Sequence, residues 1–156
     1  MFPHHECETA QSESVTGRPF VGHWLHVGLV GLDGTKMSKS LGNLVFVGDL
    51  LKEWEPAAIR LALLAHHYRT DWEWTDADMP AAERRLRAWR GAPVPAPSGE
   101  PDAPGGPAAE AELGLDLVRA ALDDDLDTPG ALAALDAEAA AGRPVVRGAT
   151  LLGVTL

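Results

Sequence analysis

The stretch APVPAPSGEPDAPGGPAA, residues 92–109, limits what this chain can fold into more than any other segment. It holds six prolines and three glycines in eighteen positions. Proline fixes φ and removes a backbone donor, and glycine adds backbone freedom, so a packed helix or strand cannot form there. We therefore predict a flexible, partly extended linker at 92–109, which separates the front of the chain from a helical segment at 110–156.

Residues 48–91 have the spacing and end signals of short helices and form a predicted helical connecting region. Asp49 is placed to cap a first helix, and Pro56 suits the first position of a second helix. Within that second helix, Ile59 and Leu63 recur at helical spacing. A third helix is expected from a cap at Thr75 or Asp76 to a stop at Gly91, with Leu86 and Trp89 on its inward face.

The segment 110–156 predicts two further helices and an apolar tail. The inward residues of the first helix are expected to be Leu113, Leu117, Ala120 and Ala121. The second is expected to begin with Thr128 as its cap and Pro129 at its first position. The acidic run Asp123–Asp125 between them is typical of a solvated helix end.

Residues 1–47 mix short apolar runs with glycine and polar residues. The stretch HWLHVGLVGLDG, residues 23–34, predicts a strand that runs into a loop. Further on, Trp72 and Trp74 alternate as in a short strand or a loop and are expected in the core, with a sugar platform as the alternative. His66 and His67 stand at a helix end, where packing or capping is the expected role rather than catalysis.

A small loop rich in lysine and serine follows the predicted strand, in LDGTKMSKSLGN, residues 32–43. One interpretation of Lys36 and Lys39 is a solvated surface turn. The other is a phosphate clamp, in which the ammonium groups neutralise a polyphosphate while Ser38, Ser40 and backbone N–H groups donate hydrogen bonds. The net charge of the chain is −10, so a site for an anion has to concentrate its cations locally.

The N-terminal stretch FPHHECE places two histidines, a cysteine and two glutamates close together. If it is helical, His4 and Glu8 share a face and can bind one metal ion; the alternative is a polar helix start. A closed zinc site needs about four ligands, and Cys7 lies off that face. The chain therefore does not supply a complete site by itself.

Composition restricts the compartment and the partners. Cys7 is the single cysteine, no apolar run approaches a membrane span, and no secretory signal is visible, so we expect a cytoplasmic protein without a membrane partner. Residues 1–91 carry 12 acids and 10 bases, whereas residues 92–156 carry 11 acids and 3 bases. A polyanion is therefore expected to meet the front of the chain.

Three motifs occur together: FPHHE with Glu8 following, KMSKSLGN, and DDDLDTPGAL. In this combination the chain resembles the C-terminal half of class I cysteine-activating ligases. This group contains the cysteinyl-tRNA synthetases and the ligase that joins cysteine to glucosaminyl-inositol in mycothiol synthesis. The resemblance covers residues 2–91 and returns at 113–135, and KMSKS followed by SLGN is its most specific part.

The resemblance implies an α/β fold, with residues 1–47 as the C-terminal part of a Rossmann-type catalytic domain, followed by a mainly α-helical bundle. It implies ATP and cysteine as substrates, which form cysteinyl-adenylate before an acceptor attacks. Lys39, and second Lys36, would stabilise the leaving pyrophosphate, and Val30 would contact the adenine through its backbone. His4 and Glu8 would be zinc ligands, with the other ligands in the N-terminal half.

The resemblance leaves the acceptor open between two classes. The stretches HVGLVGLDGTKMSKSLGNLVFV and HHYRTDWEWTD are more similar to the mycothiol ligases, and an acidic second half is a poor surface for tRNA, so a small amino sugar is favoured. Glu8 is the residue found in the cysteinyl-tRNA synthetases and favours tRNA. A non-catalytic remnant that retains the helical bundle is the third reading.

The histidine-containing phosphate loop and the two zinc-binding cysteines of the family do not occur in these 156 residues. The chain alone is therefore expected to be inactive. We expect it to be the C-terminal part of a split or truncated gene, or a product whose start was assigned too late, with a separately encoded N-terminal half as a possible partner. Its front strands would then lack sheet neighbours and expose apolar side chains.

Overall fold

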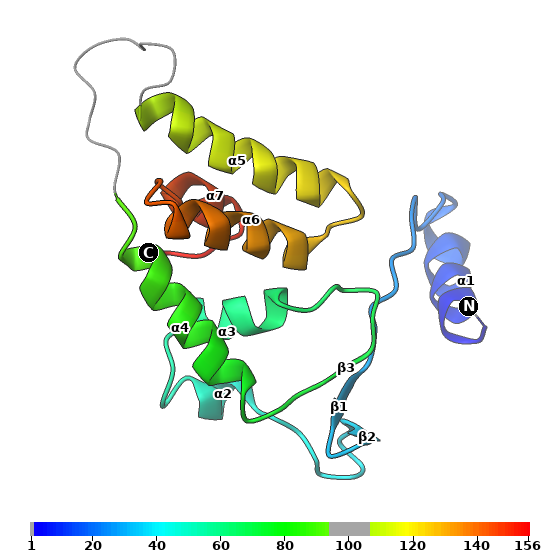
Figure 1. The fold of residues 1–156 in the computed structure, drawn as a ribbon. Coiled ribbons are helices and arrows are strands. Elements are labelled where there is room, and N and C mark those ends of the chain that lie inside the picture. Colours follow the sequence, from blue (N-terminus) through cyan, green and yellow to red (C-terminus); the bar gives the residue numbers. More distant parts are fainter. Residues whose placement is uncertain (1, 94–106) are drawn as a thin grey trace.

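The computed structural model describes residues 2–93 and 107–156, which form a helical bundle, a small sheet and an outlying N-terminal helix (Figure 1). Most of the predicted linker, 94–106, lies outside the described residues. The elements in chain order are α1 (His4–Thr16), β1 (Val30–Leu32), β2 (Thr35–Lys36), α2 (Val47–Leu50), α3 (Pro56–Leu64), β3 (Trp72–Glu73), α4 (Asp78–Arg90), α5 (Pro107–Asp123), α6 (Thr128–Ala140) and α7 (Val146–Leu151).

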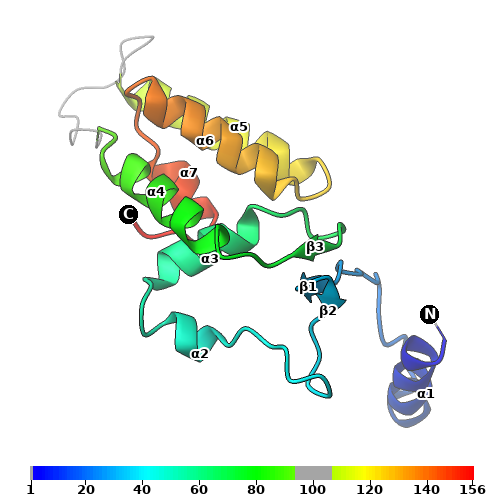
Figure 2. The same ribbon diagram turned by 60° about the horizontal axis from the view of Figure 1, so that its bottom comes forward.

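The bundle is built from α3 to α7. Helix α3 packs on α4, helix α5 packs on α6 and α7, and α4 joins the two groups by packing on α6. Figure 2, turned by 60°, shows the same grouping, with the sheet at one end of α3 and α1 well away from the bundle. The largest fully buried side chains all belong to this bundle and the short tail after it: Trp89, Leu61, Leu86, Leu132, Leu135, Val118, Val145 and Val154.

For the helices that precede the linker, the capping and proline signals in the sequence predicted some helix ends correctly and others wrongly. Helix α3 does begin at Pro56, and α4 ends at Gly91 with Leu86 and Trp89 buried, as expected. Asp49 is not a cap, because α2 already begins at Val47 and contains it. The cap of α4 is Ala77 rather than Thr75 or Asp76, but the carboxylate of Asp78 accepts hydrogen bonds from the backbone N–H and hydroxyl of Thr75 and closes the turn from inside the helix.

The buried faces of two helices are rotated from those predicted. In α3 the buried residues include Leu61 and Ala62, whereas Leu63 is exposed. In α5, Leu115 and Val118 are buried while Leu117 is exposed. Helix α6 does have Pro129 in its first turn, but its cap is Asp127, whose carboxylate accepts the Gly130 N–H at 2.9 Å.

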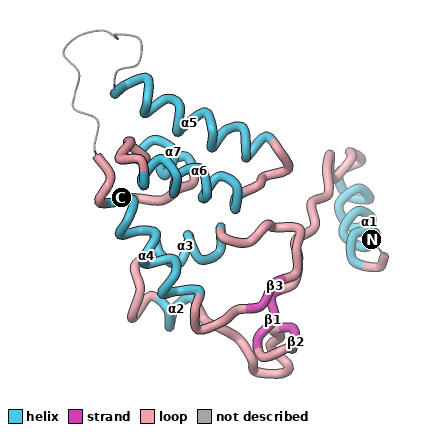
Figure 3. Tube along the Cα trace, in the orientation of Figure 1, coloured by secondary structure: helices cyan, strands magenta, loops and turns pink. Residues whose placement is uncertain are grey.

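The sheet has the strand order β2-β1-β3. Strand β1 pairs antiparallel with β2 and parallel with β3, with Val30 opposite Trp72. The strand expected within 23–34 is therefore present but short, since regular pairing begins only at Val30. Figure 3 shows these three strands at the end of long loop segments.

The front of the chain has no buried core of its own. Among the described residues before Ala58, none is classed as buried, and the exposed apolar side chains concentrate here, including Trp24, Leu25, Val27, Phe46 and Val47. The expectation of an exposed apolar front is confirmed. No helix in the described part of the chain combines the length and the apolar character required to cross a membrane.

Candidate functional site

The hairpin β1–β2 positions the loop that contains the two lysines. Its turn uses Asp33 and Gly34, both with positive φ, which matches the right-handed twist of paired strands. The Gly34 N–H donates to the Glu73 carboxylate of β3, so the turn is fastened to the neighbouring strand. After β2, the Met37 N–H donates to the Val30 carbonyl at 3.0 Å, and this bond fixes the start of the loop.

The side chain of Asn43 forms hydrogen bonds across the lysine loop, residues 36–43, and fixes its conformation. Its side-chain oxygen accepts the Ser38 N–H at 2.9 Å, and its amide nitrogen donates to the Lys36 carbonyl at 3.2 Å. The hydroxyls of Ser38 and Ser40 lie 3.2 Å apart and share a hydrogen bond. Asn43 is therefore a positioning residue of the loop, a role that its place in the SLGN motif alone did not reveal.

Lys36 and Lys39 are both exposed, and neither forms an ion pair with another described residue. Lys52, in contrast, is paired with Asp49 at 2.6 Å. Free ammonium groups on a hydrogen-bonded loop remain available for an anion, since no internal carboxylate competes for them. The structure places Lys36, Ser38, Lys39 and Ser40 on one loop, and their role as a phosphate clamp stays a prediction.

A shallow depression of about 370 Å³ adjoins the loop at the sheet. It is lined by residues of all three strands, among them Gly31, Thr35, Lys36 and Trp72. Val30 lies in β1 next to Gly31, and its backbone carbonyl already accepts a hydrogen bond from the Met37 N–H. The predicted backbone contact of Val30 with adenine stays a prediction.

The predicted metal ligands lie on α1, which confirms that His4 and Glu8 are one helical turn apart on an exposed helix. Their donor types fit two positions of a zinc site. The described residues contain no group of three or more potential ligands, so any site built here takes further ligands from elsewhere. His5 has a different role, because its ring stacks on Trp24 at 4.0 Å and on His26 at 4.8 Å.

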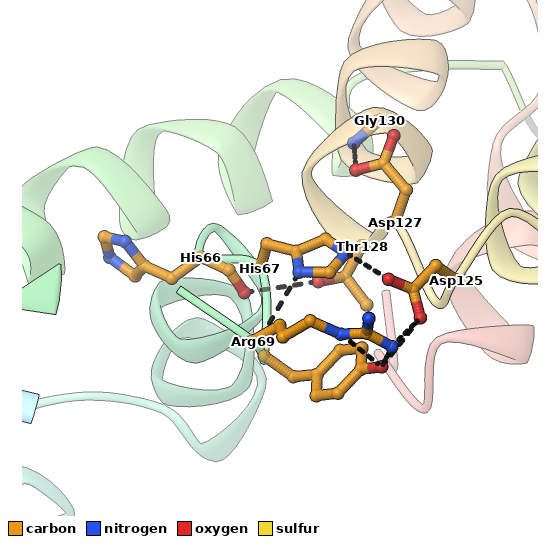
Figure 4. Close-up of polar contacts among 8 residues, drawn as sticks. His66, His67, Arg69, Asp125, Asp127, Thr128 and Gly130 are labelled. Carbon is orange, nitrogen blue, oxygen red and sulfur yellow. Dashed lines mark hydrogen bonds and ion pairs between the residues drawn. The ribbon is translucent and has the colours of Figure 1, made fainter. Parts of the chain in front are cut away.

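A second polar cluster joins the loop between α3 and β3 to the turn between α5 and α6 (Figure 4). The Asp125 carboxylate accepts a hydrogen bond from the Tyr68 hydroxyl at 2.7 Å and from the Arg69 guanidinium at 2.6 Å. The Arg69 guanidinium also donates to the Tyr68 hydroxyl at 2.6 Å. This hydrogen bond first, and then the charge of Asp125, raises the pKa of Arg69 above its ordinary value. His67 lies 3.9 Å from the other carboxylate oxygen. We call this group of four residues the Asp125 cluster.

The acidic run Asp123–Asp125 is exposed at the end of α5, as the sequence predicted, and Asp125 additionally accepts the hydrogen bonds of the Asp125 cluster. Asp125 and Leu126 both have positive φ, an unfavourable backbone conformation for residues other than glycine. The hydrogen bonds to Asp125 hold this turn in place. Sequence reasoning missed the cluster because Asp125 lies more than fifty positions after the other three members and no local pattern links them.

His66 packs against neighbouring side chains, which is one of the two roles expected for it from the sequence. Its ring stacks on Trp72 at 3.7 Å, and its Nε2 lies 3.5 Å from the Asp78 carboxylate. The backbone carbonyl of the same residue accepts the Thr128 hydroxyl at 3.4 Å. Of the strand and the loop expected at this position, the structure has the short strand β3, and both Trp72 and Trp74 are half-buried rather than fully buried in the core.

Comparison with known families identifies the first half of the chain. Residues 1–84 match the model of the tRNA synthetases class I (C) catalytic domain. Among curated relatives, the L-cysteine:1D-myo-inositol 2-amino-2-deoxy-alpha-D-glucopyranoside ligase of Thermobifida fusca is 57% identical over 87% of this chain and 31% of its own length. The ligase of the same name from Catenulispora acidiphila is 56% identical over 87% of this chain and 30% of its own length.

A third relative of that name, from Kytococcus sedentarius, is 46% identical over 100% of this chain and 40% of its own length. The chain therefore spans about a third of the length of the curated relatives it matches. These matches confirm the resemblance predicted from the motifs.

Among solved structures, the LeuRS of Agrobacterium radiobacter K84, in a ternary complex with tRNA and LeuAMS, shares the fold. The superposition covers 93% of this chain and 21% of that chain, with a TM-score of 0.55 and 22% sequence identity. The fold is thus class I synthetase-like, with mixed helices and a small sheet.

Proposed function

Because this chain belongs to the family of tRNA synthetases class I (C) catalytic domains, we propose that it forms part of an ATP-dependent cysteine ligase. In the proposed reaction, the cysteine carboxylate attacks the α-phosphorus of ATP, and pyrophosphate leaves. The amine of glucosaminyl-inositol then attacks the carbonyl of cysteinyl-adenylate, and AMP leaves. The ligases from Thermobifida fusca and Catenulispora acidiphila, which are named for this acceptor, support the choice.

The lysine loop carries the proposal. Its two ammonium groups are exposed and free of ion pairs with described residues, and the loop that bears them is tied down by Asn43. Lys39, with Lys36 second, stabilises the negative charge that develops on the β- and γ-phosphates as pyrophosphate leaves. Ser38 and Ser40 offer hydroxyl donors to the same phosphates, and the Val30 backbone lies at the edge proposed for adenine.

We propose a zinc ion as the part of the site that binds the cysteine side chain. His4 and Glu8 would hold the ion together with ligands from the part of the relatives that this chain does not span. A thiophilic metal at that position would favour the thiolate of cysteine over the hydroxyl of serine. We further propose that residues 1–47 complete a Rossmann-type catalytic domain and that catalysis requires the complementary part of the enzyme.

Charge supports a small acceptor over tRNA. Residues 92–156 carry 11 acids and only 3 bases, and tRNA binding depends on neutralising phosphates. Glu8 is the feature that favours a cysteinyl-tRNA synthetase, which is the second candidate function.

The test is cysteine-dependent exchange of pyrophosphate into ATP by an enzyme reassembled from this chain and the complementary part of a relative. Lys39→Ala should lower the exchange rate by about 10²–10³, the scale for losing one preorganised transition-state contact, with little effect on cysteine binding. Lys52→Ala is the matched control, since Lys52 lies outside the loop and pairs with Asp49. A loss of cysteine affinity with an unchanged exchange rate contradicts the clamp.

A further inference from the structure

The α3–β3 loop, residues 65–71, connects the helical bundle to the sheet that bears the lysine loop. Among the described elements, the strands contact one another but share no extensive packing with any helix of the bundle. The position of the sheet relative to the bundle therefore depends on the segments that join them. The α3–β3 loop has polar contacts on both sides, with the bundle and with the front of the chain.

Tyr68 contacts the bundle through its side chain. Its hydroxyl donates to the Asp125 carboxylate at 2.7 Å and accepts a hydrogen bond from the Arg69 guanidinium at 2.6 Å. Arg69 also donates to Asp125 at 2.6 Å, and Figure 4 shows these two side chains pointing toward each other. The α3–β3 loop is thereby tied to the turn between α5 and α6, and the Tyr68 hydroxyl contacts both partners.

The backbone of the same residue contacts the front of the chain. The Tyr68 carbonyl accepts the Gly28 N–H at 2.7 Å, just before β1 begins. The two backbones lie so close here that a Cβ atom at Gly28 would stand 2.2 Å from the Thr70 carbonyl oxygen, an approach that only glycine permits. The Asp71 carboxylate accepts the neighbouring Leu29 N–H at 2.6 Å. The α3–β3 loop therefore fixes the entry to β1.

Strand β1 leads from this entry to the lysine loop. It turns directly into β2, which ends at Lys36, and the Val30 carbonyl accepts the Met37 N–H at 3.0 Å, at the start of the loop. A continuous path thus runs from the Asp125 carboxylate through Tyr68 and β1 to the Met37 amide. It consists of hydrogen bonds that short stretches of chain connect, as a contiguous coupling network requires.

We propose that Tyr68 is a positioning residue of the ligase, which sets the lysine loop relative to the helical bundle through its hydroxyl. This proposal rests on the proposed function, because the step it serves is the loss of pyrophosphate at Lys39. Tyr68 acts on this step through Gly28, β1 and the loop, and not on the reacting atoms. The turn at Asp125, which belongs to the C-terminal helices, thereby contributes to the geometry of the front of the chain.

The first experiment measures amide hydrogen exchange by NMR in the 156-residue chain and in Tyr68→Phe, which removes only the hydroxyl. The Gly28 and Met37 amides should exchange about 5-fold faster in the variant, the scale for one lost hydrogen bond, while the amides of α6 stay slow. Arg87→Gln is the matched control, since it breaks an exposed ion pair of 2.6 Å with Glu83 on α4 and should leave both amides unchanged.

Unchanged exchange of either amide, in a variant that circular dichroism shows to be folded, overturns the proposal. Arg69→Gln removes the guanidinium that donates to the same hydroxyl. It should accelerate the same two amides, and it supplies the readout if Tyr68→Phe does not fold.

The second experiment is a double-mutant cycle in pyrophosphate exchange by the reassembled enzyme. Tyr68→Phe should lower kcat about 5-fold and leave the KM for cysteine unchanged. In the Lys39→Ala background the same change should lower kcat by less than about 2-fold, because residues that act through one network are not additive. An unchanged kcat, an equal loss in both backgrounds or a raised KM for cysteine overturns the proposal, since none of these results fits an action through Lys39.

The two experiments separate this proposal from the proposed function. A reassembled wild-type enzyme that catalyses no exchange of pyrophosphate contradicts the proposed function, and the Gly28 and Met37 amides then still decide whether Tyr68 positions the loop. An active wild-type enzyme in which Tyr68→Phe behaves like Arg87→Gln contradicts the positioning role alone.

Discussion

Asn43 provides the sharpest test of how the lysine loop is held. Its side chain accepts the Ser38 N–H at 2.9 Å and donates to the Lys36 carbonyl at 3.2 Å, with a longer contact of 3.5 Å to the Thr35 carbonyl. Two ordinary hydrogen bonds at about 1 kcal/mol each give roughly 2 kcal/mol of loop stabilisation. Asn43→Ala should therefore raise the equilibrium for opening of the loop about 30-fold.

The assay is amide hydrogen exchange followed by NMR. The Ser38 amide should exchange about 30-fold faster in Asn43→Ala, because its acceptor is lost, while the amides of α6 stay slow. Asn43→Asp is the matched control, since its carboxylate still accepts the Ser38 N–H but no longer donates to the Lys36 carbonyl. It should give an intermediate rate. Unchanged Ser38 exchange in Asn43→Ala, or equal rates in the two variants, would refute the assignment of Asn43 as the residue that holds the loop.

Three further predictions concern the bundle. Asp125→Asn removes the ion pair with Arg69 and should lower the midpoint of a urea titration only slightly, because both side chains are largely exposed and water screens their attraction; a large drop contradicts this assignment. The hydrogen bond from Arg143 lowers the pKa of Glu138 below the ordinary carboxyl value of 4.5. The stability that this pair contributes is therefore complete above pH 4.5 and is lost as the pH falls through the lower pKa of Glu138 in the folded protein. Glu138→Gln should make the melting temperature fall less steeply over this acidic range. Gly148→Ala places a methyl group against buried side chains of α5 and α6, the nearest at 2.6 Å, and should destabilise the chain by about 1–3 kcal/mol in the same titration; an unchanged midpoint contradicts the packing described.

Sequence alone predicted the elements whose signals are local. Pro56 begins α3 because its ring fixes φ and it needs no N–H partner there, and Gly91 ends α4. Leu86 and Trp89 are buried because their three-residue spacing places them on one face of α4. The lysine loop was recognised in the same way, from contiguous residues.

The failures occurred where tertiary packing decides. Leu117 fits a helical stripe as well as Val118 does, but the position of α7 beside α5 selects the face that contains Val118. Asp127, rather than Thr128, caps α6, since the threonine hydroxyl instead donates to His66 across the bundle. Asp125 contacts Tyr68 and Arg69 because the turn between α5 and α6 packs against the loop between α3 and β3, so no window of sequence contains that contact.

The most direct test of the central claim is AMP release by the reassembled enzyme with each acceptor in turn. The enzyme is supplied with ATP and cysteine, and AMP is quantified after adding either glucosaminyl-inositol or tRNA. We predict that glucosaminyl-inositol triggers AMP release in wild type, that Lys39→Ala reduces it by about 10²–10³, and that tRNA adds nothing. Cysteine transfer to tRNA without a response to the amino sugar would contradict the proposed ligase and establish the synthetase reading.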